Sequence, residues 1–129
     1  MKRRTFIRNL NAGSGLLTAF PYEALALQEK LYPYDRVKLG NTGIEMSRMA
    51  MGTGTHGFGG ASNQTRQLGI KGVSDMLLAA KDDGINFWET ADQYGSHPHV
   101  GEALKKVNRE EVVILTKTNS TTYEDVKKD

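Results

Sequence analysis

Ionisable side chains follow two apolar stretches of this chain. Residues 87–95 read FWETADQYG and carry Glu89 and Tyr94, and residues 112–118 read VVILTKT and carry Lys117. A phenol with an ordinary pKa of about 10 is a poor proton donor at neutral pH, but a nearby ammonium group favours the phenolate and makes tyrosine a usable general acid. A carboxylate beside the lysine would keep the ammonium charged and oriented. Tyr94, Lys117 and Glu89 are therefore candidate catalytic residues.

The same three residues also fit an arrangement without chemistry. A surface ion pair between Glu89 and Lys117, with Tyr94 packed on a helix, accounts for them equally well, because such clusters mark functional sites only in a statistical sense. The choice depends on whether the fold brings the two apolar stretches side by side.

The elements that would position these groups alternate between strands and helices. Residues 40–43 read GNTG between two short apolar patterns, which predicts a β-hairpin. After the hairpin, the patterns predict a buried strand at 47–51, a polar loop at 61–69, a helix from 70 that stops at Gly84, a strand at 85–88, a helix capped by Ser96, a strand at 112–115 covered on both faces, and a helix opened by a capping box at Thr121 and Glu124.

Strands that alternate with amphipathic helices predict an α/β fold with a parallel sheet and right-handed crossovers. In such sheets the functional groups gather where the strands end. The three strand ends read Gly52-Thr53-Gly54, residues 89–94 and residues 116–118. The candidate residues thus stand where a parallel fold builds its site.

Residues 35–129 resemble, in continuous order, the N-terminal part of the aldo/keto reductase family. The resemblance rests on the hairpin and on the stretches RMAMGTGTHGFGG, GINFWETADQYG, VGEALKK and VVILTKT. It implies the N-terminal part of a (β/α)8 TIM barrel, closed at the bottom by the hairpin and incomplete in this chain. It also implies an NADP-dependent oxidoreductase that transfers hydride from NADPH to an aldehyde or ketone through a tetrad of Asp, Tyr, Lys and His.

The resemblance assigns roles residue by residue. Tyr94 matches the tyrosine that protonates the carbonyl oxygen, and Lys117 matches the lysine that activates it. Glu89 stands where the family has its aspartate, so Glu89 and Lys117 are also expected near the cofactor. Gly52, Thr53 and Gly54 match the turn that lies against the nicotinamide.

Two departures from the family pattern stand out. Glu89 adds a methylene to the expected aspartate, and a shift of about 1 Å in a catalytic group can cost much rate. The family's histidine has no counterpart, because it follows a fourth strand that the sequence does not reach. A barrel takes about 250 residues and about 100 follow residue 26, so the chain taken alone is expected to be inactive. A non-catalytic secreted binding or regulatory module on the same scaffold is the alternative.

Other chemistry-bearing patterns favour weaker interpretations. His56 and His97 are candidate substrate-lining residues. His97 and His99 stand two apart, which on a helix points them in different directions, so no metal site is expected. Residues 52–57 satisfy G-x-G-x-x-G, but no helix and no acidic residue follow at the spacing that a Rossmann dinucleotide site requires.

The N-terminus predicts export. Residues 1–8 read MKRRTFIR, a mildly apolar stretch follows, and Ala24-Leu25-Ala26 resembles a signal-peptidase site. Residues 1–26 are thus expected to be a twin-arginine signal peptide that uses the twin-arginine export machinery to reach a bacterial periplasm, with a linker at 27–34. A basic tail or a first amphipathic helix is the alternative.

Composition and charge argue against several kinds of partner and chemistry. A net charge of +2 with no long run of one sign after residue 10 gives no sign of a nucleic-acid partner. No stretch reaches the roughly 18 apolar residues of a membrane span, so no stable anchor is expected. The absence of cysteine excludes disulfides, thiolate metal sites and thiol catalysis.

Overall fold

The computed structural model describes residues 30–128, of which residues 32 onward belong to one compact unit. The predicted signal peptide and most of the predicted linker lie outside the described residues. The last residues of that linker form a turn, in which the Asp35 backbone N–H donates to Tyr32 O at 3.2 Å and the Tyr32 and Tyr34 rings stack with centroids 5.3 Å apart. None of the helices in residues 30–128 is long and apolar enough to cross a bilayer.

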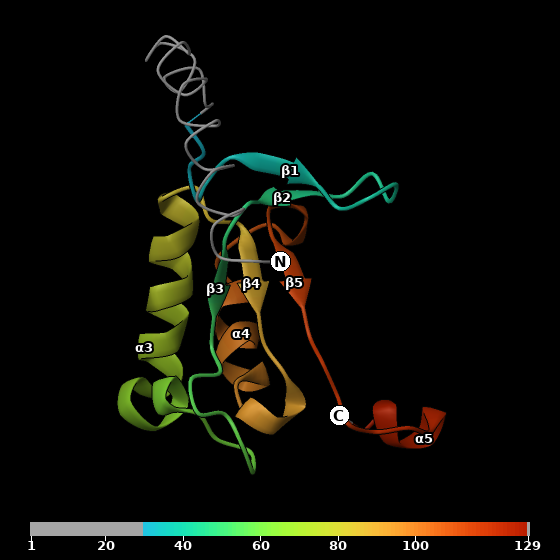
Figure 1. Cartoon of the computed structure of the whole chain (residues 1–129). Helices are drawn as coiled ribbons and strands as arrows, with labels where there is room; N and C mark the ends of the chain where they lie inside the picture. The colour runs from blue at the N-terminus through green and yellow to red at the C-terminus, as the bar shows by residue number, and fades with distance from the viewer. Residues whose placement is uncertain (1–29, 129) are drawn as a thin grey trace, which may run out of the picture. The chain divides into compact units, whose positions relative to one another are not determined.

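The predicted hairpin is present. Strands β1 (Arg36–Lys38) and β2 (Glu45–Ser47) pair antiparallel, with Val37 opposite Met46. Gly40 and Gly43 have φ values of 51° and 77°, which a glycine adopts without steric cost. Figure 1 shows the hairpin across the end of the sheet at which the parallel strands begin.

A buried amide fastens the hairpin to the sheet. The Ser47 N–H donates to Asn86 Oδ1 at 2.8 Å, and the Phe87 N–H donates to Ser47 Oγ at 3.2 Å. The Asn86 Nδ2 reaches Glu111 O at 3.3 Å. This accounts for the polar residue that interrupts the apolar run before residue 87.

Three parallel strands form the sheet, in the order β3 (Ala50–Gly52), β4 (Phe87–Glu89) and β5 (Val113–Leu115). Their register aligns Met51, Trp88 and Ile114 in one row, and Gly52, Glu89 and Leu115 in the next. Side chains alternate between the two faces of a strand, so these two rows point to opposite faces.

Both crossover helices pack against the face that carries Trp88 (Figure 1). Helix α3 (Asn63–Asp82) follows β3, and helix α4 (His97–Leu104) follows β4. The core gathers fully or almost fully buried apolar side chains from both helices, from β4 and from the approach to β5: Val73, Leu77, Trp88, Val100, Ala103 and Val112. The α/β class and the parallel sheet are as predicted.

The start of α3 differs from the prediction. Residues 61–69 were expected to be a loop, but a helix begins at Asn63. Ser62 Oγ accepts from the Thr65 N–H at 3.2 Å, and Thr65 Oγ1 accepts from the Ser62 N–H at 2.8 Å, which is a capping box. The helix is then broken at Gly69 (φ 62°, ψ −176°), and this break hides the periodicity of the first turns.

Side chains in and beside β3 and β5, the two outer strands of the sheet, are less buried than the apolar sequence runs predicted. The strand expected at 47–51 divides, because Ser47 ends β2 and Met49 is half exposed before β3 begins. Val112, just before β5, is buried, but no residue within β5 is fully buried, and Leu115 is 43% exposed. The prediction of cover on both faces is wrong for the described residues because α3 and α4 lie on the same side of the sheet.

The short C-terminal elements follow the expected order with small shifts. The 3₁₀ turn η2 (Arg109–Glu111) precedes β5, and the Lys81 ammonium, 3.0 Å from the Glu111 carboxylate, hydrogen-bonds to it and lowers the pKa of Glu111 below its usual value. Helix α5 (Tyr123–Val126) is capped by Thr122, one residue later than expected, through a 3.2 Å bond from the Asp125 N–H.

Candidate active site

The three strand ends meet at one edge of the sheet. Glu89 ends β4 and lies between Gly52 of β3 and Leu115 of β5 in the register. Tyr94 belongs to the 3₁₀ turn η1 (Asp92–Tyr94) just beyond β4, and Lys117 lies two residues beyond β5. The Glu89 row points to the face that the helices leave open, so its carboxylate faces away from the core.

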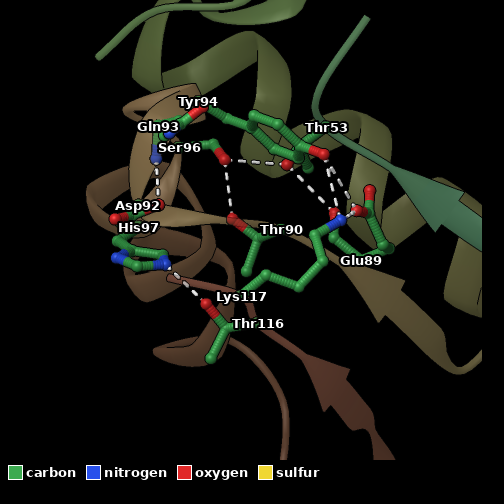
Figure 2. A network of polar contacts seen from close by, with 10 residues as sticks. All are labelled: Thr53, Glu89, Thr90, Asp92, Gln93, Tyr94, Ser96, His97, Thr116 and Lys117. Carbon is green, nitrogen blue, oxygen red and sulfur yellow. Dashed lines mark hydrogen bonds and ion pairs between the residues drawn. The ribbon is translucent and has the colours of Figure 1, made fainter. Parts of the chain in front are cut away.

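Tyr94, Lys117 and Glu89 form one hydrogen-bonded cluster (Figure 2). The Lys117 Nζ donates to the Tyr94 hydroxyl at 3.0 Å, and that hydroxyl donates to Glu89 Oε1 at 3.3 Å. Lys117 also forms an ion pair with the same carboxylate oxygen. The Lys117 side chain is 46% exposed and that of Glu89 22% exposed, so the cluster borders solvent.

The glycines after β3 surround this cluster. A Cβ at Gly52 would lie 3.4 Å from Glu89 Oε2. A Cβ at Gly54 or Gly57 would overlap the Tyr94 ring. The G-x-G-x-x-G spacing was considered only as a Rossmann signal, and this contact with Tyr94 was not predicted from the sequence.

A buried chain of hydroxyls lies beneath the cluster (Figure 2). Thr53 Oγ1 is 2.7 Å from Ser96 Oγ, and Ser96 Oγ is 2.7 Å from Thr90 Oγ1. Thr53 Oγ1 also donates to Glu89 O at 3.0 Å. Thr53 and Ser96 are completely buried, so the Thr53 hydroxyl holds the strand ends together, and its expected contact with a cofactor remains a prediction.

Ser96 does not cap α4 through its side chain, contrary to the prediction. It occupies the position before the helix, but its hydroxyl bonds with Thr53 and Thr90 instead of a backbone N–H of the first turn. No local sequence pattern pointed to this network, because serine is a preferred cap at a helix start.

Strand β5 holds the turn η1 from the other side. The Thr90 N–H donates to Leu115 O at 2.8 Å, and the Asp92 N–H donates to Lys117 O at 3.0 Å. The Thr118 hydroxyl donates to Asp92 Oδ2 at 3.1 Å. Asp92 therefore fixes the loop and does not take the place of Glu89 beside Lys117.

Two shallow pockets open beside Lys117. One of about 190 Å³ is lined by residues 91–94 and 117–119. Another of about 290 Å³ is lined by residues 116–118 with Asp92, His97 and Val126. Tyr94 and Lys117 both line the first pocket.

The structure separates the two histidines that were expected to line the substrate. His97 borders the second pocket, with Nε2 2.8 Å from Thr116 Oγ1. His56 lies in the glycine loop with a φ of 50°, and its Nδ1 is 3.1 Å from Asn63 Nδ2. It lines neither of these pockets. Residues 30–128 contain no group of three or more His, Cys, Asp or Glu side chains placed to hold a metal ion.

The chain is similar in sequence to the aldo/keto reductase family and to several named reductases. The model of the "Aldo/keto reductase family" matches residues 50–129. Over 87 residues the chain is 44% identical to the NADH-specific methylglyoxal reductase of Escherichia coli (strain K12), covering 64% of this chain and 26% of that protein. It is 38% identical over 85 residues to the versiconal hemiacetal acetate reductase of Aspergillus parasiticus, covering 62% of this chain and 24% of that protein.

Among solved structures, a thermostable aldo-keto reductase in complex with the inhibitor epalrestat superposes with a TM-score of 0.49 at 28% identity. It covers 64% of this chain and 30% of that one. The chain spans about a quarter of the length of the curated relatives it matches. The strand and helix order, the parallel sheet and the matched family model together show that this chain belongs to the aldo/keto reductase family.

Proposed function

We propose that this chain supplies the proton-donating half of a carbonyl reductase site. One observation carries the proposal: the Tyr94 hydroxyl lies 3.0 Å from the Lys117 ammonium and 3.3 Å from the Glu89 carboxylate, and Tyr94 and Lys117 line a common pocket. A phenol next to a cation is a donor matched to an oxygen that becomes negative during reduction.

A nicotinamide cofactor would supply the hydride to the carbonyl carbon, as in the family. As the carbonyl π electrons move to oxygen, Tyr94 gives its proton to that oxygen and becomes a phenolate. The Lys117 ammonium stabilises the phenolate by a charge-assisted hydrogen bond. Glu89 holds the ammonium through their ion pair, and a proton from solvent then restores the phenol.

The carboxylate of Glu89 lies close to the end of β3, where a Cβ on Gly52 would be 3.4 Å from Glu89 Oε2. We propose NADP(H) as the cofactor from the family resemblance. The related methylglyoxal reductase is named NADH-specific, which makes NAD(H) the alternative that the assay has to compare.

The catalytic histidine of the tetrad is expected from residues that follow the matched part of the family. The hydride-transfer activity therefore belongs, in this proposal, to the complete gene product, and the described residues alone are expected to be inactive. A small aldehyde or ketone is the expected substrate class. Methylglyoxal is the first compound to assay because a relative is named for it.

We also propose export to the periplasm by the twin-arginine route. The support is the order of features in residues 1–26: paired arginines, a mildly apolar stretch and Ala24-Leu25-Ala26. A reductase whose cofactor is bound during folding in the cytoplasm is suited to a route that carries folded proteins.

The test is carbonyl-dependent oxidation of NADPH and NADH by the complete gene product. Tyr94→Phe removes only the hydroxyl, and we expect kcat to fall by roughly 10²- to 10⁴-fold, the usual contribution of a general acid. Tyr123→Phe is the matched control, because the Tyr123 side chain is exposed on α5. Equal rates for wild type and Tyr94→Phe would refute the role of Tyr94. No turnover of any carbonyl by the wild type would favour the non-catalytic module.

A further inference from the structure

The Tyr94 ring lies directly against backbone that has no side chains. A Cβ built on Gly54 would have ring atoms of Tyr94 as its three nearest neighbours. A Cβ built on Gly57 would meet the same ring and would also lie 2.9 Å from Gly54 O. The turn between them is closed by the Gly57 N–H, which donates to Gly54 O at 2.8 Å.

Backbone conformation does not explain these two glycines. The glycines with positive φ are residues 40, 43, 59, 60, 69, 84 and 95, and neither Gly54 nor Gly57 is among them. An alanine is therefore compatible with the backbone conformation at both positions. A side chain is excluded at these positions because its Cβ would overlap neighbouring atoms, chiefly those of the Tyr94 ring.

The loop cannot simply move away from the ring. The Gly60 N–H donates to Gln93 O at 2.9 Å, and Gly95, with a φ of 60°, lies so close that a Cβ there would overlap Gly60 O. The loop is thus joined to the backbone on both sides of Tyr94. A side chain added beneath the ring has to displace the ring itself.

The position of the ring decides the position of its hydroxyl. The Lys117 Nζ lies 4.9 Å from the ring centroid and 3.0 Å from the hydroxyl. A displacement of about 1 Å is enough to break a hydrogen bond of this length and can cost about 100-fold in rate.

We propose that Gly57, together with Gly54, is a positioning residue for Tyr94: the absent side chains let the phenol ring lie against the loop, which holds its hydroxyl beside Lys117. This inference rests on the proposed function. For Gly54 this role is additional to the contact with the nicotinamide that the family resemblance implies.

The kinetic test uses Gly57→Ala in the complete gene product. We expect kcat to fall by about 100-fold, with cofactor affinity unchanged and with a displaced pH profile of kcat, because the distance between phenol and ammonium changes. The matched control is Gly101→Ala in α4, where a Cβ meets nothing within 4 Å and alanine suits a helix better than glycine. An unchanged kcat and pH profile in Gly57→Ala would overturn the proposal.

A double-variant cycle separates positioning from general damage. In a Tyr94→Phe background the hydroxyl is already absent, so Gly57→Ala is expected to cause little further loss of rate. If it lowers the rate by the same factor in both backgrounds, the glycine does not act through the Tyr94 hydroxyl and the proposal fails.

Melting temperatures test the contact between Gly54 and the Tyr94 ring without any measurement of activity. Introduced into the wild type, Gly54→Ala is expected to lower the melting temperature. Introduced into Tyr94→Ala, the same substitution is expected to leave the melting temperature unchanged, because that variant lacks the ring that the Cβ would overlap. Equal destabilisation in both backgrounds would overturn the ring contact. Because this cycle needs no substrate, its failure is distinct from failure of the reductase proposal, which is read from wild-type turnover.

Discussion

At the residue scale, we propose that Glu89 takes the place of the aspartate that the family resemblance leads us to expect. Glu89 ends β4, and its side chain reaches both the Lys117 ammonium and the Tyr94 hydroxyl, the latter at 3.3 Å. The carboxylate has two distinct tasks here: its charge holds the ammonium, and its length sets where the ammonium stands.

Charge and length can be separated by two substitutions in the complete gene product. Glu89→Gln keeps the length and removes the charge, and Glu89→Asp keeps the charge and shortens the side chain by one methylene. If the ion pair with Lys117 is the main task, we expect Glu89→Gln to lose about 100-fold in kcat and Glu89→Asp to lose less. The measurement is steady-state turnover of a carbonyl with both nicotinamide cofactors. A Glu89→Gln variant as active as Glu89→Asp would show that charge is not needed.

At the element scale, hydroxyl groups connect the ends of β3 and β4 with the start of α4. Thr53, Ser96 and Thr90 are buried and bonded in a row, and Thr53 also binds the carbonyl of Glu89. Buried polar groups stabilise a fold when each has a partner and destabilise it when one partner is lost. Ser96 stands in the middle of the row, so it is the member whose loss leaves a gap.

Two serine substitutions test this network against a matched control. Ser96→Ala leaves Thr90 Oγ1 without this bond, and we expect the free energy of unfolding to fall by about 1–3 kcal/mol. Ser74→Ala removes an equally buried hydroxyl that has no hydrogen-bond partner, so we expect no loss of unfolding free energy. Urea titration of both variants checks the difference. Similar unfolding free energies for the two variants would contradict the role of the network.

At the scale of the whole molecule, one face of the sheet is packed and the other carries the site. Helices α3 and α4 cover the Trp88 row, whereas the Glu89 row and the half-exposed Leu115 face the opposite side. In a complete (β/α)8 barrel the strands enclose the face opposite the helices. The chain spans about a quarter of the length of its curated relatives, and its described residues supply three parallel strands.

The proposed export depends on residues 1–26 and is tested at the N-terminus. In the double variant Arg3→Lys/Arg4→Lys the charge is retained and the paired arginines are lost, so we expect the protein to stay unprocessed in the cytoplasm. Cell fractionation and mass spectrometry of the N-terminus check this, with wild type expected to begin after Ala26. An intact Met1 in exported wild-type material, or unaltered export of the double variant, would contradict the prediction.

Local sequence patterns were enough to predict the order of the elements and the family. The hairpin, the helical periodicity from residue 70, the αL stop at Gly84 (φ 88°) and the run before Lys117 depend on local patterns, and the structure confirms them. Local sequence also placed Glu89, Tyr94 and Lys117 at strand ends. The helix start at Ser62 was missed because a break at Gly69 interrupts the periodicity.

How these residues contact one another depends on the packing of the strands and loops. The 3.0 Å bond from Lys117 to Tyr94 depends on the neighbour order of β4 and β5, and the glycine surface under Tyr94 depends on a loop that returns from β3. The cover of β5 was mispredicted for the same reason: an apolar run shows that a strand prefers burial, but which face is covered depends on the side to which both helices cross. Contacts between residues far apart in sequence are set by packing, and local propensity does not record them.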